Sequence, residues 1–162
     1  MKRCGLVFVG GGLGAVLRAV LLAQFSTADS IAIVLLINLI GSFVLGLVFV
    51  LADEAGLLRA QARFFLAVGV LGGFTTFSTF GWGADVLVAH HELARATVYL
   101  LGTAGGGVVA VQAGLAVGRE LVVQLERSAR ALLRRLNEHG VRSGATATDM
   151  AAIEAEDRVE SA

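Results

Sequence analysis

The sequence contains no proline and a single cysteine among its 162 residues. The lone thiol, Cys4, excludes an internal disulfide. Without proline, a helix must be interrupted by another cause, such as adjacent glycines or threonines, which weaken helices. Neither sign of charge is in excess, because 13 basic residues balance 13 acidic ones. This balance excludes the basic surface of a nucleic-acid-binding protein.

Charge is missing altogether from two long stretches, residues 31–51 and 64–84. Charged residues make up 16% of the chain and hydrophobic residues 56%, whereas soluble domains contain about 25% and 45–50%. Uncharged stretches of about 20 residues are typical of membrane spans. The composition therefore predicts an integral membrane protein, with the lipid bilayer as its solvent.

Four apolar segments are long enough to cross the hydrocarbon core, which needs about 20 residues. They are residues 5–25, 31–51, 64–88 and 96–117. The links between them are short, which forces neighbouring spans to run antiparallel and places both termini on one side. The start, Met1-Lys2-Arg3 before an apolar run, also resembles a signal peptide. An uncleaved first span explains it better, because the run continues to Phe25 and three more spans follow.

The composition changes after Gly118. In residues 119–136, leucines such as Leu121, Leu125 and Leu132 recur at helical spacing between arginines, which predicts an amphipathic helix at the lipid headgroups. Residues 137–162 are small, polar and acidic, and have too little apolar surface to fold. The expected organisation is a four-helix transmembrane domain (1–118), an amphipathic interfacial helix (119–136) and a disordered acidic tail (137–162).

Small residues recur every four positions in the apolar segments. The longest such ladder, in the fourth segment, is Gly102, Gly106, Ala110, Gly114 and Gly118. Helices in lipid gain nothing hydrophobic by touching one another, so close backbone approach through small residues holds them together. The ladders predict tight helix–helix packing. Because four short helices enclose little interior, some ladders are expected to face another subunit.

The third segment carries the motif GGFTTFSTF at residues 72–80. Two adjacent glycines and two adjacent threonines predict a break in the helix at mid-bilayer. Each unsatisfied backbone group there costs several kcal/mol. A cation held by carbonyl oxygens would satisfy the exposed backbone. The alternative is a simple kink, repaired by the serine and threonine hydroxyls.

Four side chains within the spans are candidates for an anion path. Phe77 and Phe80 lie three residues apart on one helical face, and the positive ring edge of phenylalanine can coordinate a small anion; such a pair can equally be core. Asn38 offers an amide N–H in mid-span, or an interhelical hydrogen bond. Arg18 is costly in hydrocarbon and should reach a wet vestibule or a partner.

No arrangement of residues predicts an enzyme. The three histidines, His90, His91 and His139, lie in a loop and in the tail, where solvated side chains are expected. The sequence GGGLGA at residues 10–15 loosely matches a dinucleotide-binding fingerprint. That motif requires a preceding strand, which an apolar helix does not provide, so helix packing explains these glycines better.

These motifs resemble the CrcB/Fluc fluoride channel family. The resemblance covers residues 5–118 and rests on GGGLGAVLR (10–18), NLIGSFVLG (38–46) and GGFTTFSTF (72–80), in family order and spacing. It implies an all-α membrane protein whose third helix is interrupted. Two four-helix subunits would form an antiparallel dimer with two fluoride pores. Its function would be passive fluoride export across a bacterial plasma membrane, which relieves fluoride toxicity and requires no enzyme activity.

The resemblance also implies roles for individual residues. Phe77 and Phe80 would coordinate fluoride, Asn38 would supply a pore amide, and Tyr99 and Thr103 would line the pore. The carbonyls of Gly72 and Thr75, from both subunits, would hold a structural, non-transported Na⁺. These roles are implied by motif position in the family and not by spacing in this chain.

The chain departs from the family after the break, where the usual Ser-x-Glu is replaced by Gly81-Trp82-Gly83. A non-conducting partner subunit therefore remains an alternative, as does a four-helix small multidrug transporter, which would need a carboxylate in the first span.

Basic residues are more numerous on the side of the membrane that bears the termini than on the other side. The first side has Lys2, Arg3, Arg59, Arg63 and Arg119, and the other has Arg18 and Arg95. Because loop lysines and arginines set orientation, this bias favours both termini in the cytoplasm, and a subunit fixed that way cannot supply its own inverted partner. We therefore hypothesise a paralogue of opposite charge bias as the partner, with a second copy of this chain as the alternative.

Overall fold

The protein is helical throughout the part of the chain that its computed structural model describes. That part comprises residues 2–160, without the side chains of Lys2, Thr27, Ala28 and 135–160, and it contains no strand. Four helical stretches are long and apolar enough to span a membrane: Arg3–Leu22, Asp29–Glu54, Ala60–Ala89 and Leu93–Arg134. The predicted all-α, four-span fold is therefore confirmed.

The first two spans are α1 (Lys2–Leu22) and α2 (Thr27–Phe49), and α2 continues as the π-helical turn η1 (Val50–Glu54). Ser26 begins α2 as its N-cap, since its hydroxyl oxygen accepts a hydrogen bond from the Asp29 N–H at 3.3 Å. Such a cap satisfies one of the free amides at a helix start.

The third span is built from four helical pieces. They are α3 (Ala60–Arg63), η2 (Phe64–Leu71), α4 (Gly72–Phe74) and α5 (Ser78–Ala89). Between α4 and α5, Thr75 has extended backbone angles, with φ −72° and ψ 155°. The break predicted for residues 72–80 is therefore confirmed, and it lies at Thr75, Thr76 and Phe77.

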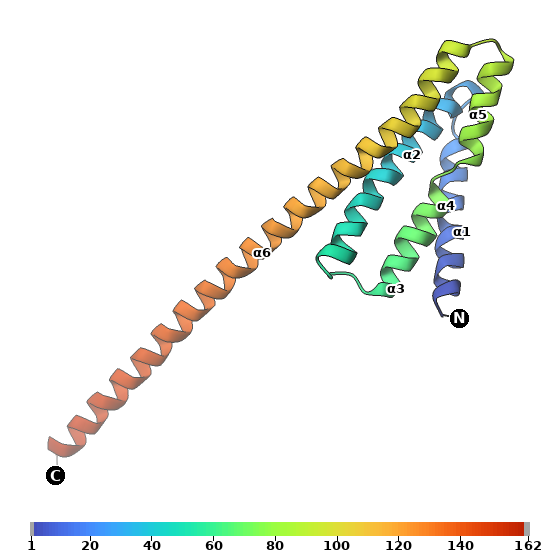
Figure 1. Ribbon diagram of the computed structural model, residues 1–162. Helices are drawn as coiled ribbons and strands as arrows, with labels where there is room; N and C mark the ends of the chain where they lie inside the picture. The colour runs from blue at the N-terminus through green and yellow to red at the C-terminus, as the bar shows by residue number, and fades with distance from the viewer. Residues whose placement is uncertain (1, 161–162) are drawn as a thin grey trace. The chain divides into compact units, whose positions relative to one another are not determined.

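The last helix, α6, runs from Leu93 to Glu160 (Figure 1). Its residues belong to two compact units, Met1–Val122 and Val123–Ala162. The helix has no break at Gly118, where the sequence predicts a change from membrane domain to interfacial helix. That division stays a prediction, as does disorder in 137–162, which lies outside the residues whose side chains are described.

Within the first unit, glycines bring helix backbones into direct contact. A β-carbon at Gly14 of α1 would lie 2.0 Å from the Val70 carbonyl oxygen of η2. A β-carbon at Gly114 of α6 would lie 2.0 Å from the Phe43 carbonyl oxygen of α2. No larger residue fits either place, so the tight packing predicted from the small-residue ladders is confirmed.

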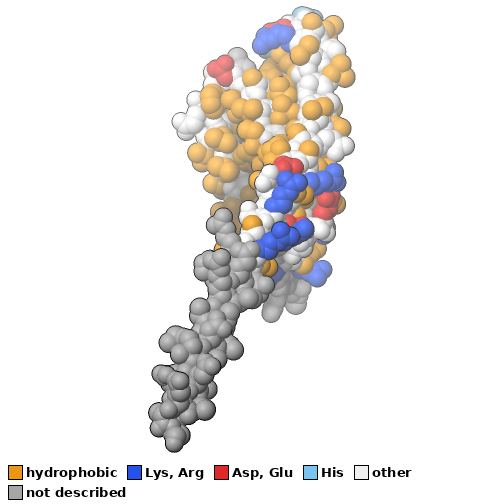
Figure 2. Space-filling model, turned by 90° about the vertical axis from the view of Figure 1, so that its left-hand side faces the viewer, with side chains coloured by type: hydrophobic (Ala, Val, Ile, Leu, Met, Phe, Trp, Pro, Cys, Tyr) orange, Lys and Arg blue, Asp and Glu red, His pale blue; other side chains and the backbone are white. Residues whose placement is uncertain are grey.

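Apolar side chains cover the outside of the first unit, as a lipid environment requires. Phe8, for example, is 83% exposed on α1. In Figure 2, charged side chains lie towards the two ends of this apolar region. At the end bearing the N-terminus, Arg63 pairs with Asp53, and Arg119 forms a bidentate pair with Glu54 at 2.7 and 2.9 Å.

Candidate functional site

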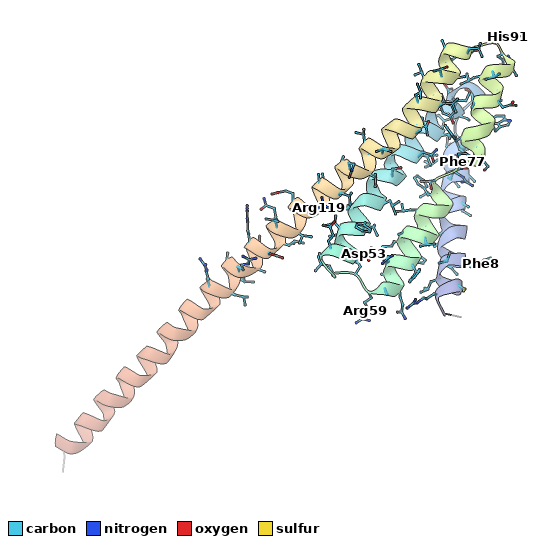
Figure 3. All side chains as sticks on the ribbon, in the orientation of Figure 1. Phe8, Asp53, Arg59, Phe77, His91 and Arg119 are labelled. Carbon is cyan, nitrogen blue, oxygen red and sulfur yellow. The ribbon has the colours of Figure 1, made fainter. Side chains whose placement is uncertain are left out.

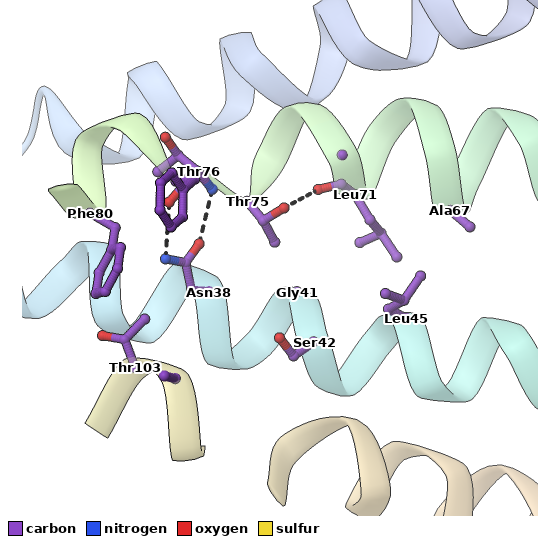
Figure 4. A pocket seen from close by; sticks show the side chains of 13 residues that line it. Asn38, Gly41, Ser42, Leu45, Ala67, Leu71, Thr75, Thr76, Phe80 and Thr103 are labelled. Atoms are coloured by element: carbon purple, nitrogen blue, oxygen red, sulfur yellow. Dashed lines mark hydrogen bonds between the residues drawn. The ribbon is translucent and has the colours of Figure 1, made fainter. Parts of the chain in front are cut away.

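The break in the third span is held open by Asn38 of α2. The Thr76 N–H donates to Asn38 Oδ1 at 2.9 Å, and Asn38 Nδ2 donates back to the Thr76 carbonyl at 3.2 Å (Figure 4). In a continuous helix the Thr76 N–H would instead donate to the carbonyl of Gly72. The Asn38 side chain thus replaces the helical hydrogen bonds that the Thr76 N–H and carbonyl have lost at the break.

Two of the backbone carbonyls at the break, those of Gly72 and Thr75, lack their helical donors. The Gly72 oxygen loses the Thr76 N–H to Asn38. The Thr75 oxygen loses the Thr79 N–H, which donates to the Thr76 hydroxyl at 3.2 Å. These are the two carbonyls that the family resemblance implies for Na⁺, and carbonyls at unwound segments are suitable Na⁺ ligands.

Arg18 reaches the same break from α1. Its guanidinium donates to the Thr75 carbonyl at 3.1 Å. This contact gives a charged group inside an apolar span a partner, as its cost in hydrocarbon requires. A carbonyl has two lone pairs, so the Thr75 oxygen can accept this bond and still offer a second pair to a cation. The predicted vestibule role of Arg18 stays a prediction.

An open pocket of about 370 Å³ lies beside the break. Elements far apart in the sequence line it: α2, η2, α4, the break itself, α5 and α6. Its lining includes Asn38, Gly72, Thr75, Phe77, Phe80 and Thr103, six of the eight predicted site residues. No lining residue is charged, so the pocket combines apolar walls with hydroxyl, amide and carbonyl groups.

The two phenylalanines differ in their surroundings. Phe77, at the start of α5, is 83% exposed, and Figure 3 labels it at the break. Its ring centroid is 5.7 Å from that of Phe80, with the rings inclined by 52°. Phe80 in turn lies 5.2 Å from the ring of Tyr99 on α6. The three aromatic rings therefore form a continuous row from the exposed face into the helix bundle.

Tyr99 stands at the buried end of this row, outside the pocket lining. It is 5% exposed, and its hydroxyl has no hydrogen-bond partner among the described residues. Gly83 lies beside this hydroxyl, since an added β-carbon there would be 3.1 Å from the hydroxyl oxygen. A buried hydroxyl without a partner is costly, so this donor is available to a ligand.

Thr103 lines the pocket, but its hydroxyl hydrogen is already used. It donates to the Tyr99 carbonyl, one turn earlier in α6, at 2.7 Å. While that bond persists, Thr103 offers a passing ion only lone pairs. Of the Tyr99 and Thr103 hydroxyls, only that of Tyr99 therefore has a hydrogen that is not already donated within the described residues.

The sequence did not single out Thr76, the residue with most bonds at the break. Besides its two bonds to Asn38, its hydroxyl is 3.1 Å from the Thr79 hydroxyl and 3.3 Å from that of Ser78. Its place between Thr75 and Phe77 in the motif was the only signal. The sequence did not single out Gly41 either. This glycine packs against the break, since an added β-carbon would lie 2.3 Å from Thr75 Cγ2.

No side-chain metal site accompanies the carbonyls. Among the described residues, no group of three or more His, Cys, Asp or Glu is placed to hold a metal ion. One chain supplies two freed carbonyl oxygens, from Gly72 and Thr75, which is half of a four-oxygen set. By ligand type the site fits Na⁺, provided that a second chain supplies the remaining oxygens.

These features define a class: a multi-pass membrane protein whose third span is interrupted beside an uncharged pocket. The family described as "CrcB-like protein, Camphor Resistance (CrcB)" matches residues 5–115. The chain belongs to this CrcB family. It is 38% identical over 117 residues to the "Fluoride-specific ion channel FluC" of Prosthecochloris aestuarii, which covers 70% of this chain and 91% of the relative.

Two further relatives carry the same name. One from Methylobacterium nodulans is 42% identical over 117 residues, covering 71% of this chain and 94% of its own. One from Thermus thermophilus is 41% identical over 125 residues, covering 75% of this chain and 99% of its own. Both are named as ion channels and not as enzymes. The family match spans the region of the site and ends before Gly118.

Proposed function

We propose that this chain is a subunit of a passive, fluoride-selective channel in a bacterial plasma membrane. The observation that carries the proposal is the exposed Phe77 beside an uncharged polar pocket at a mid-span helix break. The positive edge of an aromatic ring attracts a small anion without the binding strength of a full charge. An ion that must leave again requires such moderate binding.

Hydrogen-bond donors near the rings support the same path. Asn38 Nδ2 carries two hydrogens, and its bond to the Thr76 carbonyl uses one of them. The Tyr99 hydroxyl is buried and unpartnered beyond Phe80. A dehydrating fluoride ion could therefore exchange water for an amide N–H, ring edges and a hydroxyl. An inside-negative potential of 100 mV supplies about 2.3 kcal/mol per charge for export, so the channel needs no ATP.

A second subunit completes the proposed channel. Phe77 and the freed carbonyls lie on an open face, where a partner in the opposite orientation would cover them. The carbonyls of Gly72 and Thr75 from both chains would hold a structural Na⁺ that is required for function and is not transported. The partner is a second copy of this chain or a paralogue. Gly83 lies beside Tyr99 where the family usually has a glutamate, so a pore built with this Tyr99 lacks that carboxylate. This difference favours a dimer whose two pores are unlike.

The test compares two phenylalanines that are equally exposed. Phe77 and Phe8 are each 83% exposed, but only Phe77 lies at the break (Figure 3). Phe77→Ile keeps most of the apolar volume and removes the ring edge. We expect it to lower fluoride efflux from proteoliposomes about tenfold, and Phe8→Ile to leave efflux unchanged. Equal efflux through both variants, with the protein still assembled, would reduce Phe77 to a packing residue.

A further inference from the structure

The part of α6 between Val123 and Arg134 leaves every side chain exposed. Three of these side chains are leucines, since Leu125, Leu132 and Leu133 are 58%, 59% and 65% exposed. The family match ends at residue 115, so the proposed channel function does not account for this segment. An exposed apolar surface of this kind indicates an interaction site.

The segment is amphipathic. At about 100° per residue, four apolar side chains fall within an arc of about 100°, and the three arginines fall within about 60° on the other side. Val123 and Ala131 lie outside the apolar arc. The apolar face comprises Leu125, Ala129, Leu132 and Leu133; the basic face comprises Arg127, Arg130 and Arg134. A helix with a basic face and a leucine-rich face is suited to lie at a membrane surface.

We propose that Val123–Arg134 docks on anionic phospholipid headgroups of the membrane that the preceding spans cross. Its apolar face would enter the acyl boundary and its arginines would contact lipid phosphates. The part of α6 from Leu93 to Arg134 has 42 residues, about twice the number that crosses the hydrocarbon core, so its last part extends beyond a single span. The charged groups of Glu54 and Arg119 pair shortly before the segment, so it begins near the membrane boundary.

The charges of this segment favour an anionic lipid surface over a second copy of the helix as its binding partner. The segment carries three arginines and one acid, Glu126, which pairs with Arg130 at 2.6 Å. Two copies packed through their leucines would leave the arginines on the far side of each helix without acidic partners, whereas coiled coils place opposite charges beside the apolar seam. An anionic lipid surface complements all three arginines. Each basic residue near such a surface strengthens binding about fivefold.

The test places one fluorophore on each face of the full-length protein. In a Cys4→Ser background, Leu132→Cys and Val123→Cys are labelled separately with an environment-sensitive dye. These positions are nine residues apart and so lie on opposite sides of the helix. Each protein is reconstituted into brominated phosphatidylcholine vesicles with or without one-third phosphatidylglycerol, and bromine quenching of the dye is measured.

We expect quenching at Leu132 and not at Val123, and only where phosphatidylglycerol is present. In the Leu132→Cys protein, replacing Arg127, Arg130 and Arg134 together with Gln should weaken this docking about 100-fold and abolish the quenching. Equal quenching of both positions, or quenching that ignores lipid charge, would overturn the proposal. An unquenched dye at Leu132→Cys would also overturn it if the unlabelled Leu132→Cys protein forms intermolecular disulfides under an added oxidant, because that pair of results would identify a second copy as the occupant.

Discussion

Two adjacent glycines in the third span face different surroundings. A β-carbon at Gly73 would lie 2.2 Å from the Gly11 carbonyl oxygen of α1, so this side of the span is closed by backbone contact. A β-carbon at Gly72 would meet nothing within 4 Å, and Gly72 lines the open pocket. Identical residues therefore serve packing on one side of a helix and the proposed ion path on the other.

The largest expected effect is on the closed side. Gly73→Ala forces a methyl group into the backbone of α1, which cannot move aside as a side chain would, and should destabilise the protein by about 3 kcal/mol or more. Gly72→Ala adds the same methyl group where no atom of its own chain lies within 4 Å, in a backbone conformation with φ −63° that alanine adopts readily. It should change stability by less than about 0.5 kcal/mol.

Thermal unfolding in detergent compares these two variants directly. The expected result is a melting temperature well below wild type for Gly73→Ala and unchanged for Gly72→Ala. Similar losses in both variants would mean that the two sides of the span do not differ as described.

A smaller loss of stability is expected from replacing Asn38, which hydrogen-bonds to both backbone groups of Thr76 on the open side of the span. Asn38→Leu keeps the side-chain volume but leaves the N–H and carbonyl of Thr76, which is 7% exposed, without partners. Unsatisfied buried groups cost about 1–3 kcal/mol, so we expect a destabilisation of about 2 kcal/mol and loss of fluoride flux. Ser42→Ala, one turn further along α2 in the same pocket, is the matched control for stability. An Asn38→Leu protein as stable as this control would contradict a bracing role.

The smallest effect on stability is expected at Tyr99. Tyr99→Phe removes a buried hydroxyl that has no partner among the described residues, so stability should stay level or rise slightly. Fluoride efflux should nevertheless fall several-fold if that hydroxyl donates to the ion. Thr97→Val, which removes a hydroxyl from the same helix away from the pocket, controls for the substitution. A Tyr99→Phe protein that is less stable but conducts normally would assign the hydroxyl a purely structural role.

The sequence predicted the spans and the break because both depend on local properties. Charge-free runs of sufficient length identify spans, and adjacent glycines and threonines weaken a helix wherever they stand. A span over 96–117 and an amphipathic helix over 119–136 were expected, and α6 runs through both ranges without a break. Gly118 did not end the helix, because the alanines, leucines and arginines that follow favour it.

The details of the site depend on packing between spans and were less accessible. Nothing in the sequence assigns Gly73 to contact with α1 and Gly72 to the pocket, because that division follows from how α1 lies against η2 and α4. The contact of Arg18 with the Thr75 carbonyl joins residues 57 positions apart. The family resemblance supplied the expected roles of Asn38 and Thr103, and the structure brings both to the pocket.

The central claim is a fluoride-selective path at the break, and selective efflux tests it most directly. Proteoliposomes containing this chain, loaded with equal fluoride and chloride, are opened to efflux with a potassium ionophore while one electrode follows each anion. If the chain alone releases neither anion, it is reconstituted together with a paralogue. The account predicts rapid fluoride release with chloride retained. Release of both anions at similar rates, or of neither with any partner, would contradict it.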